Sequence, residues 1–379
     1  IVISFDGFRY DYVTKDLTPN LYKLRETGAT GHMLSQFITK TYPNHQSIAT
    51  GLFVETHGIV SNEFYDPKYN SVFNVDTSPD SWWTEFPSTP VWTVNQIHGQ
   101  YSGTNQWPGE HVKYRNIGPT HTRSFNPSIS WHSRIDTIVK WITDPHKPAN
   151  CVFMYFCEPD THSHNYGPFS KQAYEQVKRA DTLVGYLVDS LSRHNLLNTT
   201  NLIILSDHGF AEVRSSTVLK MNSIINPQWY TDYGSTPSWS IIPKPGYEDK
   251  VYETLLNASK TMPFTIYRRT DIPDHFHYSD NRRILPLFLI TNEGWDVHHD
   301  TYAHPPGYPL WGNHGWDNRL ASMRPLFVAN GPAFKKGYNL TKEFMNTDLY
   351  PLMLTVLKLP VQLYPSNGSL DAVRELLSV

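Results

Sequence analysis

The run LIILSDHG at residues 202–209 shows the pattern that decides the fold, because a short apolar, β-branched segment is followed at once by an acid and a histidine. Apolar runs of this kind are typical of strands buried in a parallel sheet. The pattern recurs in IVISFD (Ile1–Asp6) and in CVFMYFCEPD (Cys151–Asp160). Pro325–Ala329 and Leu285–Ile290 are further apolar runs, and we predict that they are strands of the same sheet.

Helical patterns lie between these strands. Thr18 and Pro19 predict a helix start, with the threonine as the cap, and Gly28 predicts its end. Apolar residues at helical spacing predict the longest helix from about Ser170 to Leu196. Strands that alternate with helices predict an α/β fold, with a mostly parallel central sheet that is covered by helices on both faces. In such a fold, ligands bind at the carboxyl ends of the strands.

Composition bounds the domain organisation and the partners. We expect residues 1–379 to form a single domain, in which Pro-, Trp- and Tyr-rich stretches at about 65–131 and 228–309 are insertions that decorate the core. The second insertion has room for a small lobe. Thirty-two basic and 35 acidic residues leave a net charge of −3 without a basic stripe, which argues against a polymeric nucleic acid as partner. We expect a monomer.

Glycosylation acceptors, rather than cysteines, carry the information on the cellular compartment. Cys151 and Cys157 lie in one predicted strand, about 20 Å apart, so they cannot pair with each other. Four N-x-[ST] tripeptides in loop-like settings favour an extracellular or cell-surface protein. No run is long enough to span a bilayer, so we expect a membrane anchor outside this stretch of chain. The acceptors are Asn198, Asn257, Asn339 and Asn367.

Acids and histidines follow three of the predicted strands. Asp6 follows the first strand, Asp160 and His164 follow the second at a spacing that shares one helical face, and Asp207 and His208 follow the third. Carboxylates and imidazoles are ligands that zinc prefers. One such pair is more often a capped turn than a metal site. Three carboxylates and two histidines after three buried strands favour a shared metal site.

The segment KTYPNHQSIATG, residues 40–51, contains the candidate nucleophile. Thr41 precedes a proline suited to a first helical turn, and Gly51 ends the helical pattern. Backbone amides at the start of a helix stabilise an anionic oxygen, which makes the Thr41 hydroxyl a candidate nucleophile. The simpler interpretation is that Thr41 only caps the helix, which is the commoner role of threonine there.

Motifs from both ends of the chain together resemble the ecto-nucleotide pyrophosphatase/phosphodiesterases, a family of the alkaline-phosphatase-like superfamily. The chain is most similar to the short, single-domain branch of that family. The motifs are SFDGFR (4–9), KTYPNH (40–45), TGLFVETHGIVSNEFYD (50–66), WPG (107–109), EPDTHSHNYGP (158–168), SDHGF (206–210), GNHGWDN (312–318) and MRPLFVANGPAFKKG (323–337).

The resemblance implies two Zn²⁺ ions as cofactors and assigns their ligands. It makes Thr41 the nucleophile and a ligand of the first zinc, and it likens Asn62 to the residue whose amide holds a non-bridging phosphate oxygen. His314 lies in a glycine-rich loop that reads as a simple turn, and only the resemblance gives it a role. The other residues that match ligands are Asp6, Asp207 and His208 for the first zinc, and Asp160, His164 and His314 for the second.

The resemblance also implies a site for the base of a nucleotide. Two aromatic residues that match Tyr42 and Tyr155 sandwich the base in nucleotide-cleaving members, and a third tyrosine of that pocket corresponds to Phe125. We expect Trp107 to line the same groove. For Phe125 and Trp107, ordinary packing is nearly as good an interpretation.

The function implied is hydrolysis of extracellular nucleotides, such as NAD, dinucleoside polyphosphates or nucleoside triphosphates, to a nucleoside 5′-monophosphate through a covalent threonyl-nucleotide. Two alternatives stay open. One is a choline-type lipid phosphodiesterase of the same family, which needs the same metals but another pocket. The other is a catalytically silent cell-surface binding protein, which is expected to have lost Thr41 or a ligand, and this chain has lost none.

Overall fold

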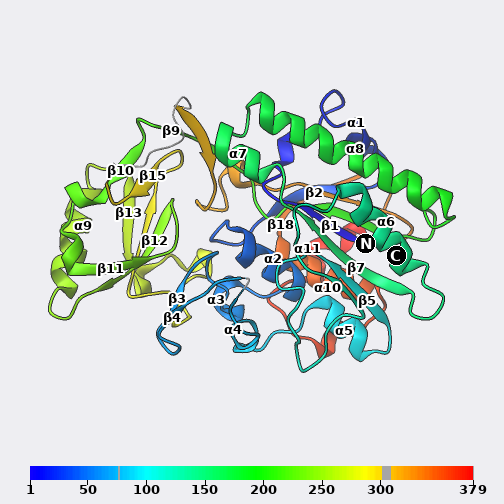
Figure 1. Ribbon diagram of the computed structural model, residues 1–379, viewed down its shortest axis with the longest axis horizontal. Helices are drawn as coiled ribbons and strands as arrows, with labels where there is room; N and C mark the ends of the chain where they lie inside the picture. Colours follow the sequence, from blue (N-terminus) through cyan, green and yellow to red (C-terminus); the bar gives the residue numbers. More distant parts are fainter. Residues whose placement is uncertain (76, 301–308, 379) are drawn as a thin grey trace.

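The computed structural model describes residues 1–75, 77–300 and 309–378, so residues 301–308 of the second expected insertion lie outside the described residues. Its centre is an eight-stranded sheet with the order β18-β2-β17-β8-β1-β7-β5-β6 (Figure 1). The strands are β1 (Val2–Phe5), β2 (Ala29–Leu34), β5 (Tyr101–Asn105), β6 (His121–Arg123), β7 (Ala149–Phe156), β8 (Leu202–Leu205), β17 (Phe327–Asn330) and β18 (Tyr338–Met345).

Helices cover both faces of this sheet. Side chains alternate between the two faces along each strand, so each strand contributes to two hydrophobic clusters. Ile3 and Met154 pack into a hydrophobic cluster with α1 (Pro19–Thr27), α6 (Trp131–Ile142) and α8 (Lys171–Arg193). Val2 and Phe153 pack into a cluster on the other face, which includes residues of α2 (Thr41–Thr50), α5 (Val91–Ile97) and α10 (Leu349–Val356). The predicted α/β fold is therefore confirmed. The remaining core helices are α3 (Val54–His57), α4 (Ser81–Thr84), α7 (Asp160–Tyr166) and α11 (Leu370–Val373).

One predicted strand of the sheet runs in the opposite direction to the others. The run at Pro325–Ala329 forms β17, which is antiparallel to both β8 and β2. The preceding loop lies at the carboxyl end of β8, where Gly209 N donates to Met323 O at 2.9 Å and Ser206 N donates to Leu326 O at 3.0 Å. Because β17 starts at the end where β8 stops, it has to run the other way.

Residues 218–300, named here the insertion lobe, form a separate antiparallel sheet with the order β11-β12-β14-β13 and a hydrophobic cluster of their own (Figure 1). The run at Leu285–Ile290, predicted as a strand of the central sheet, belongs here as β14. The elements are β11 (Tyr230–Tyr233), β12 (Ser238–Pro243), α9 (Glu248–Ser259), β13 (Phe264–Arg268), β14 (Leu287–Thr291), and the pair β10 (Val218–Lys220) and β15 (Asp296–His298).

The first expected insertion is only partly an insertion. Its early part holds the small hairpin of β3 (Tyr65–Asp66) and β4 (Ser71–Val72), but α5, β5 and β6 of the same stretch belong to the core. The weak periodicity there comes from short elements, since β6 has only three residues. A further two-stranded pair joins β9 (Ala211–Arg214) to β16 (Leu310–Asn313).

Candidate active site

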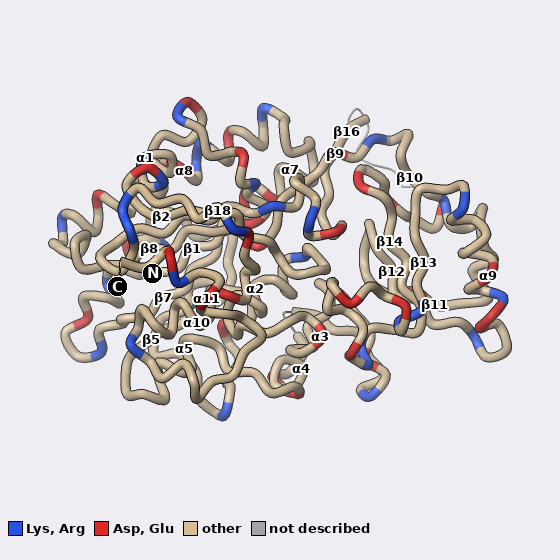
Figure 2. The backbone as a smooth tube through the Cα atoms, turned by 180° about the vertical axis from the view of Figure 1, so that it is seen from behind, with Lys and Arg blue, Asp and Glu red and all other residues tan. Residues whose placement is uncertain are grey.

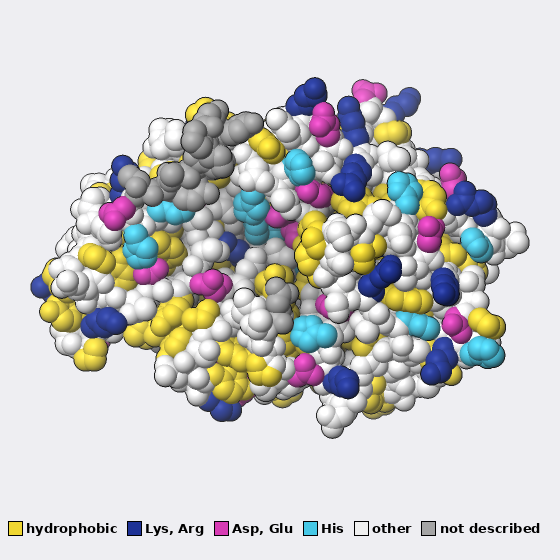
Figure 3. Space-filling view, in the orientation of Figure 1, with side chains coloured by type: hydrophobic (Ala, Val, Ile, Leu, Met, Phe, Trp, Pro, Cys, Tyr) yellow, Lys and Arg dark blue, Asp and Glu magenta, His cyan; other side chains and the backbone are white. Residues whose placement is uncertain are grey.

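The three predicted acids lie at the carboxyl ends of three neighbouring strands, β8, β1 and β7. Backbone hydrogen bonds hold these ends together: Asp6 N donates to Phe156 O at 2.9 Å, and Asp160 N donates to Asp6 O at 3.1 Å. Gly7 N donates to Oδ1 of Asp207 at 3.2 Å. The expectation that the strand ends meet is therefore confirmed. Figure 3 shows histidine and acidic side chains gathered in the hollow between the core and the insertion lobe.

Each histidine of the site has its ring orientation fixed by a backbone carbonyl. The Nδ1–H of His164 donates to Gly312 O at 3.1 Å, that of His208 to Gly209 O at 2.9 Å, and that of His314 to Thr39 O at 2.7 Å. This places the proton on Nδ1 and leaves the lone pair on Nε2, which is the arrangement of histidines that bind metal ions.

One cluster consists of Asp160, His164 and His314, the residues that match the ligands of the second zinc. Oδ1 of Asp160 lies 3.5 Å from Nε2 of His164 and 3.4 Å from Nε2 of His314. The two Nε2 atoms lie 3.2 Å apart. Ligands about 2.0–2.1 Å from a tetrahedral zinc are about 3.3 Å from one another, so these three atoms have the spacing of a shared ion.

The other cluster consists of Asp6, Asp207 and His208, the residues that match the ligands of the first zinc, and Thr41 lies beside it. Nε2 of His208 lies 3.3 Å from Oδ1 of Asp6 and 3.2 Å from Oδ2 of Asp207. Oγ1 of Thr41 is 3.5 Å from the same nitrogen. His208 also lies close to Asp160 and His314, and their ligand atoms are within 4.8 Å of one another, so the two clusters adjoin.

The charges of the two clusters favour a bound cation. Oδ1 of Asp6, Oδ1 of Asp160 and Oδ2 of Asp207 are buried and lack a hydrogen-bond partner within the described part of the chain. Burial and repulsion from the other two carboxylates raise the pKa of Asp6 well above its usual value. Burial and the neighbouring His208 lower the pKa of His314 well below its usual value. Facing lone pairs and unpaired carboxylates are costly without positive charge, so the donor set fits divalent metal ions.

Thr41 occupies the first turn of α2, where Lys40 rather than Thr41 is the N-cap residue. Its hydroxyl faces His208 and makes no capping bond to the helix amides. The cap interpretation is therefore not supported by this geometry. The amide of Tyr42 donates to Oδ1 of Asn62 at 2.9 Å, which brings Asn62 against the same turn.

His45, one turn after Thr41, was not among the predicted site residues. His45 is fully buried, and its Nδ1 lies 2.8 Å from Thr41 O while its Nε2 lies 2.9 Å from Oγ of Ser4. It therefore fixes the backbone of Thr41 against β1. In the sequence, His45 is the last residue of the motif KTYPNH (40–45) and has helical i+4 spacing from Thr41, a spacing that many buried residues share.

A pocket of about 310 Å³ lies next to the clusters. Tyr42, Tyr155 and Phe125 line it, with the Phe125 and Tyr155 rings 6.1 Å apart and Phe125 46% exposed. Trp107 is fully buried and does not line this pocket. Its ring packs edge-on against His45 at 4.8 Å, so the structure gives it a packing position instead of a place in the groove.

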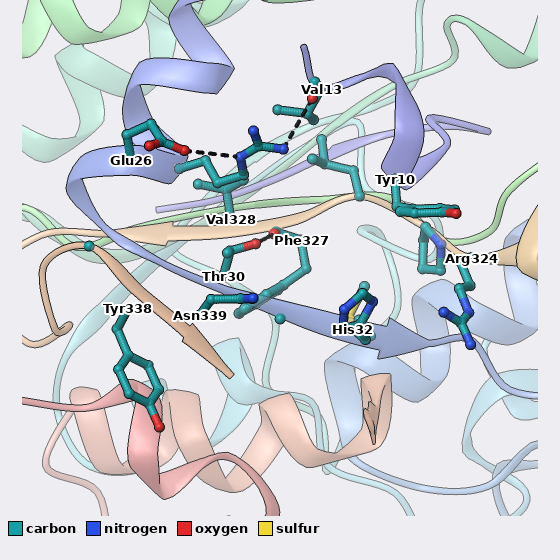
Figure 4. A pocket seen from close by; sticks show the side chains of 16 residues that line it. Tyr10, Val13, Glu26, Thr30, His32, Arg324, Phe327, Val328, Tyr338 and Asn339 are labelled. Atoms are coloured by element: carbon teal, nitrogen blue, oxygen red, sulfur yellow. Dashed lines mark hydrogen bonds and ion pairs between the residues drawn. The ribbon is translucent and has the colours of Figure 1, made fainter. Parts of the chain in front are cut away.

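A second cavity of about 530 Å³ lies away from the clusters, beside β2, β17 and β18 (Figure 4). Its polar groups largely satisfy one another: the guanidinium of Arg25 donates to Val13 O at 3.1 Å, and the hydroxyl of Thr30 donates to Phe327 O at 2.9 Å. None of the predicted ligands lines it. The chemistry is therefore concentrated at the carboxyl end of the sheet.

A family model described as type I phosphodiesterase/nucleotide pyrophosphatase matches residues 1–317. The chain belongs to this family. Human ectonucleotide pyrophosphatase/phosphodiesterase family member 5 is 39% identical to this phosphodiesterase, over 100% of the chain and 78% of the human protein. The bis(5′-adenosyl)-triphosphatase enpp4 of Xenopus laevis is also 39% identical, over 100% of the chain and 81% of that protein.

The solved structure of murine ectonucleotide pyrophosphatase/phosphodiesterase 5 matches this phosphodiesterase with a TM-score of 0.92 at 38% identity, over 100% of the chain and 99% of the mouse chain. A second structure of the mouse protein is an inactive threonine-to-alanine variant in complex with AMP. The resemblance to the short, single-domain branch is thus confirmed, and the chain is an enzyme of the pyrophosphatase/phosphodiesterase class.

The surface features that bear on the compartment are partly as expected. All four acceptor asparagines are exposed, but Asn257 lies in α9 and Asn339 in β18 rather than in loops. Within residues 1–75, 77–300 and 309–378, no helix is long and apolar enough to cross a membrane. Basic and acidic residues are interspersed along the chain, without a basic stripe (Figure 2).

Proposed function

We propose that this phosphodiesterase is zinc-dependent and hydrolyses nucleotides to a nucleoside 5′-monophosphate through a covalent intermediate on Thr41. The observation that carries the proposal is the position of the Thr41 hydroxyl. It lies 3.5 Å from Nε2 of His208, at the start of a helix and beside buried carboxylates that lack partners.

The donor set supports two zinc ions, because nitrogen and oxygen donors at tetrahedral spacing suit zinc. Bound there, the ions would favour the ionised hydroxyl of Thr41 and offset negative charge at the reacting phosphate. The residues that would hold one ion are Asp6, Asp207, His208 and Thr41, and those that would hold the other are Asp160, His164 and His314.

The chain's own residues account for the remaining steps. Oγ1 of Thr41 gives up its proton and forms a bond to phosphorus while the bond from phosphorus to the leaving oxygen breaks; the leaving oxygen keeps that electron pair and takes up a proton, and the nucleotide stays on the threonine. Water then attacks the same phosphorus, the bond to Thr41 breaks, and the hydroxyl regains a proton. Nδ2 of Asn62, whose Oδ1 accepts from the amide of Tyr42, would donate to a non-bridging oxygen, where charge accumulates.

The pocket supports a nucleotide substrate. Tyr42, Phe125 and Tyr155 offer flat aromatic surfaces next to the clusters, which suits a planar base. The relatives named as bis(5′-adenosyl)-triphosphatases and the AMP complex of the mouse protein fit the same class of substrate. We propose NAD, dinucleoside polyphosphates and nucleoside triphosphates as the compounds to compare.

The relatives include proteins named as ectonucleotide enzymes, which supports an extracellular or cell-surface location. The four exposed acceptor asparagines agree with that location. We further propose that the enzyme acts as a monomer and is anchored to the membrane through a segment outside residues 1–379.

The test compares Thr41→Ala with Thr50→Ala, a matched change at the other end of α2 where the hydroxyl bonds only to Gln46 O. Thr41→Ala is expected to lower kcat about 10³-fold or more, and Thr50→Ala to leave it nearly unchanged. Mass spectrometry of acid-quenched wild-type enzyme should find a nucleotidyl group on the peptide that contains Thr41. Unchanged turnover in Thr41→Ala would refute the proposed nucleophile.

A substrate comparison tests the pocket separately. The nitrophenyl ester of thymidine monophosphate should be cleaved faster than nitrophenyl phosphorylcholine. Faster cleavage of the choline ester would show that the enzyme is a lipid-type phosphodiesterase, even if Thr41 is the nucleophile.

A further inference from the structure

A buried carboxylate of the insertion lobe lies at the junction with the catalytic core. Asp296, at the start of β15, is 1% exposed and accepts three hydrogen bonds. They come from the indole of Trp311, the side-chain amide of Asn313 and the hydroxyl of Thr236, each at 2.8 Å. Burial raises the pKa of Asp296, but the nearby His298 and the hydrogen bonds from Trp311, Asn313 and Thr236 more than offset this and hold the pKa below its usual value.

One arm of this arrangement reaches a candidate metal ligand. Nδ2 of Asn313 donates to Asp296, and Oδ1 of the same amide accepts the backbone N–H of His314 at 2.8 Å. His314 itself is 3% exposed, and its Nδ1–H donates to Thr39 O. The backbone and the ring of His314 are therefore both fixed, the backbone from the insertion lobe and the ring from the segment before the nucleophile.

The other arm reaches the nucleophile. Lys40, which precedes Thr41 and is the N-cap residue of α2, is 3% exposed. Its ammonium donates to Thr236 O at 2.7 Å and to Oγ of Ser235 at 3.0 Å. Thr236 is thus shared, since its hydroxyl bonds to Asp296 and its carbonyl accepts from Lys40. Hydrogen bonds run without a break from His314 through the insertion lobe to the residue next to Thr41.

The space between the two arms is tightly packed. Gly315 has a φ of +122°, and a Cβ there would lie 2.9 Å from Cε of Lys40 and 2.9 Å from Cδ of Pro237. There is thus no room for a side chain at the point where Gly315, Lys40 and the insertion-lobe turn at Pro237 meet. A shift of any one of them displaces the other two.

We propose that Asp296 and Lys40 are positioning residues through which the insertion lobe holds His314 and Thr41 at their relative spacing. The inference rests on the proposed function, since it assigns these residues to the metal and nucleophile site described there. Neither side chain touches the substrate. Asp296 acts through Asn313, and Lys40 acts through the start of α2.

The test compares Asp296→Asn with Asp232→Asn, a matched change in the same lobe where the carboxylate pairs with His299 at 3.3 Å and has no hydrogen bond to Asn313, Thr236 or Lys40. In Asp296→Asn one of the two accepting oxygens becomes an NH2 group, which faces either the indole N–H of Trp311 or the donors of Asn313 and Thr236, so at least one of the three hydrogen bonds is lost. Partners that orient ligands typically change metal affinity or activity about 10–100-fold when they are altered. We expect the zinc dissociation constant of the weaker-bound ion to rise by that factor and kcat to fall.

Two readouts separate positioning from a general structural effect. KM for the nucleotide should stay within about twofold, because the pocket residues Tyr42, Phe125 and Tyr155 are outside the network. Lys40→Met keeps most of the side-chain length without the charge and should also lower kcat. Because both residues bond to Thr236 and are coupled through it, the double variant should lose less than the product of the two single losses.

Zinc affinity and kcat equal to those of Asp232→Asn would overturn the proposal. If Asp296→Asn does not fold, Thr236→Val removes the hydroxyl that donates to Asp296 and keeps the carbonyl that accepts from Lys40, and an unchanged zinc affinity and kcat in that variant overturn the proposal instead. Zinc binding is measured by titration without substrate. Loss of zinc in Asp296→Asn therefore supports the network even if wild-type protein cleaves no nucleotide, which would count against the proposed function alone. Wild-type protein that binds no zinc would overturn both.

Discussion

Tyr155 has two contacts that join the pocket to the metal clusters. Its ring lines the pocket, and its hydroxyl donates to Oδ2 of Asp6 at 2.6 Å. Burial and the nearby Asp6 raise the pKa of Tyr155 well above its usual value, so the hydroxyl stays protonated as a donor. A base stacked on this ring is thereby held at a set distance from the side chain that would bind zinc.

Phe125 provides the more exposed wall of the same pocket. Stacking of a base on an aromatic ring contributes about 1–3 kcal/mol, so Phe125→Ala should raise KM for a nucleotide about tenfold and change kcat little. Phe169→Ala is the control, because Phe169 is 45% exposed against 46% for Phe125 and does not line the pocket. Steady-state kinetics measure both. An equal effect of the two variants would remove Phe125 from the substrate site.

The acids and histidines of the site differed in how far they could be predicted from the sequence. Asp6 and Asp207 could be predicted without a relative, because they directly follow buried strands whose carboxyl ends converge. His314 could not, because it follows the short strand β16, which pairs with β9 outside the central sheet. Its place depends on a fold over more than 300 residues, and only the resemblance identified it. His45 acts through the carbonyl of Thr41, which no sequence pattern reveals.

A buried ion pair joins the β3–β4 hairpin to the insertion lobe. Asp66 in β3 and Arg283 before β14 both have fully buried side chains and meet at 2.7 Å. Arg282 also donates to this carboxylate, and Arg283 reaches Gly58 O and Trp82 O as well. The segment before β14 is thus fastened to the hairpin and to helices α3 and α4.

Asp66→Asn should destabilise the protein by about 3 kcal/mol or more at neutral pH, because it leaves a buried guanidinium without its partner. Burial raises the pKa of Asp66, but hydrogen bonds from Arg282 and Arg283 more than offset this and hold it below its usual value. The stabilisation from the charged form is therefore full above about pH 4 and is lost as the pH falls through the lowered folded-state pKa.

Denaturant unfolding at several pH values checks this prediction, and the difference between wild type and variant should shrink in acid. Asp249→Asn is the control, since Asp249 pairs with Arg268 in an exposed position where little stability is at stake. A difference that stays constant down to pH 3 would show that the charge of Asp66 is not its source.

Elements were predictable where the signal is local. The helix at α1 begins at Pro19 and ends before Gly28, as its capping pattern predicts, and α8 starts after the cap Ser170, whose hydroxyl accepts from Ala173 N. The direction of β17 could not be predicted from the local sequence, because it depends on which end of the sheet the preceding loop occupies. The assignment of β14 to the lobe sheet could not be predicted either, since a short apolar run has the same pattern in a parallel and in an antiparallel sheet.

At the scale of the whole molecule, the metal clusters draw on almost the full length of the chain, from Asp6 to His314. The insertion lobe has its own hydrophobic cluster, yet Asp296 and Thr236 connect it to both sides of the site. We therefore propose that residues 1–379 act as one catalytic domain, in which the insertion lobe contributes residues that position the active site.

Anomalous X-ray scattering at the zinc edge tests the central claim, a two-zinc site beside Thr41, most directly. Crystals of the wild-type enzyme should show two peaks about 4 Å apart. One peak is expected within bonding distance of Asp6, Asp207 and His208, and the other within bonding distance of Asp160, His164 and His314. A single peak, or peaks away from these side chains, would contradict the account.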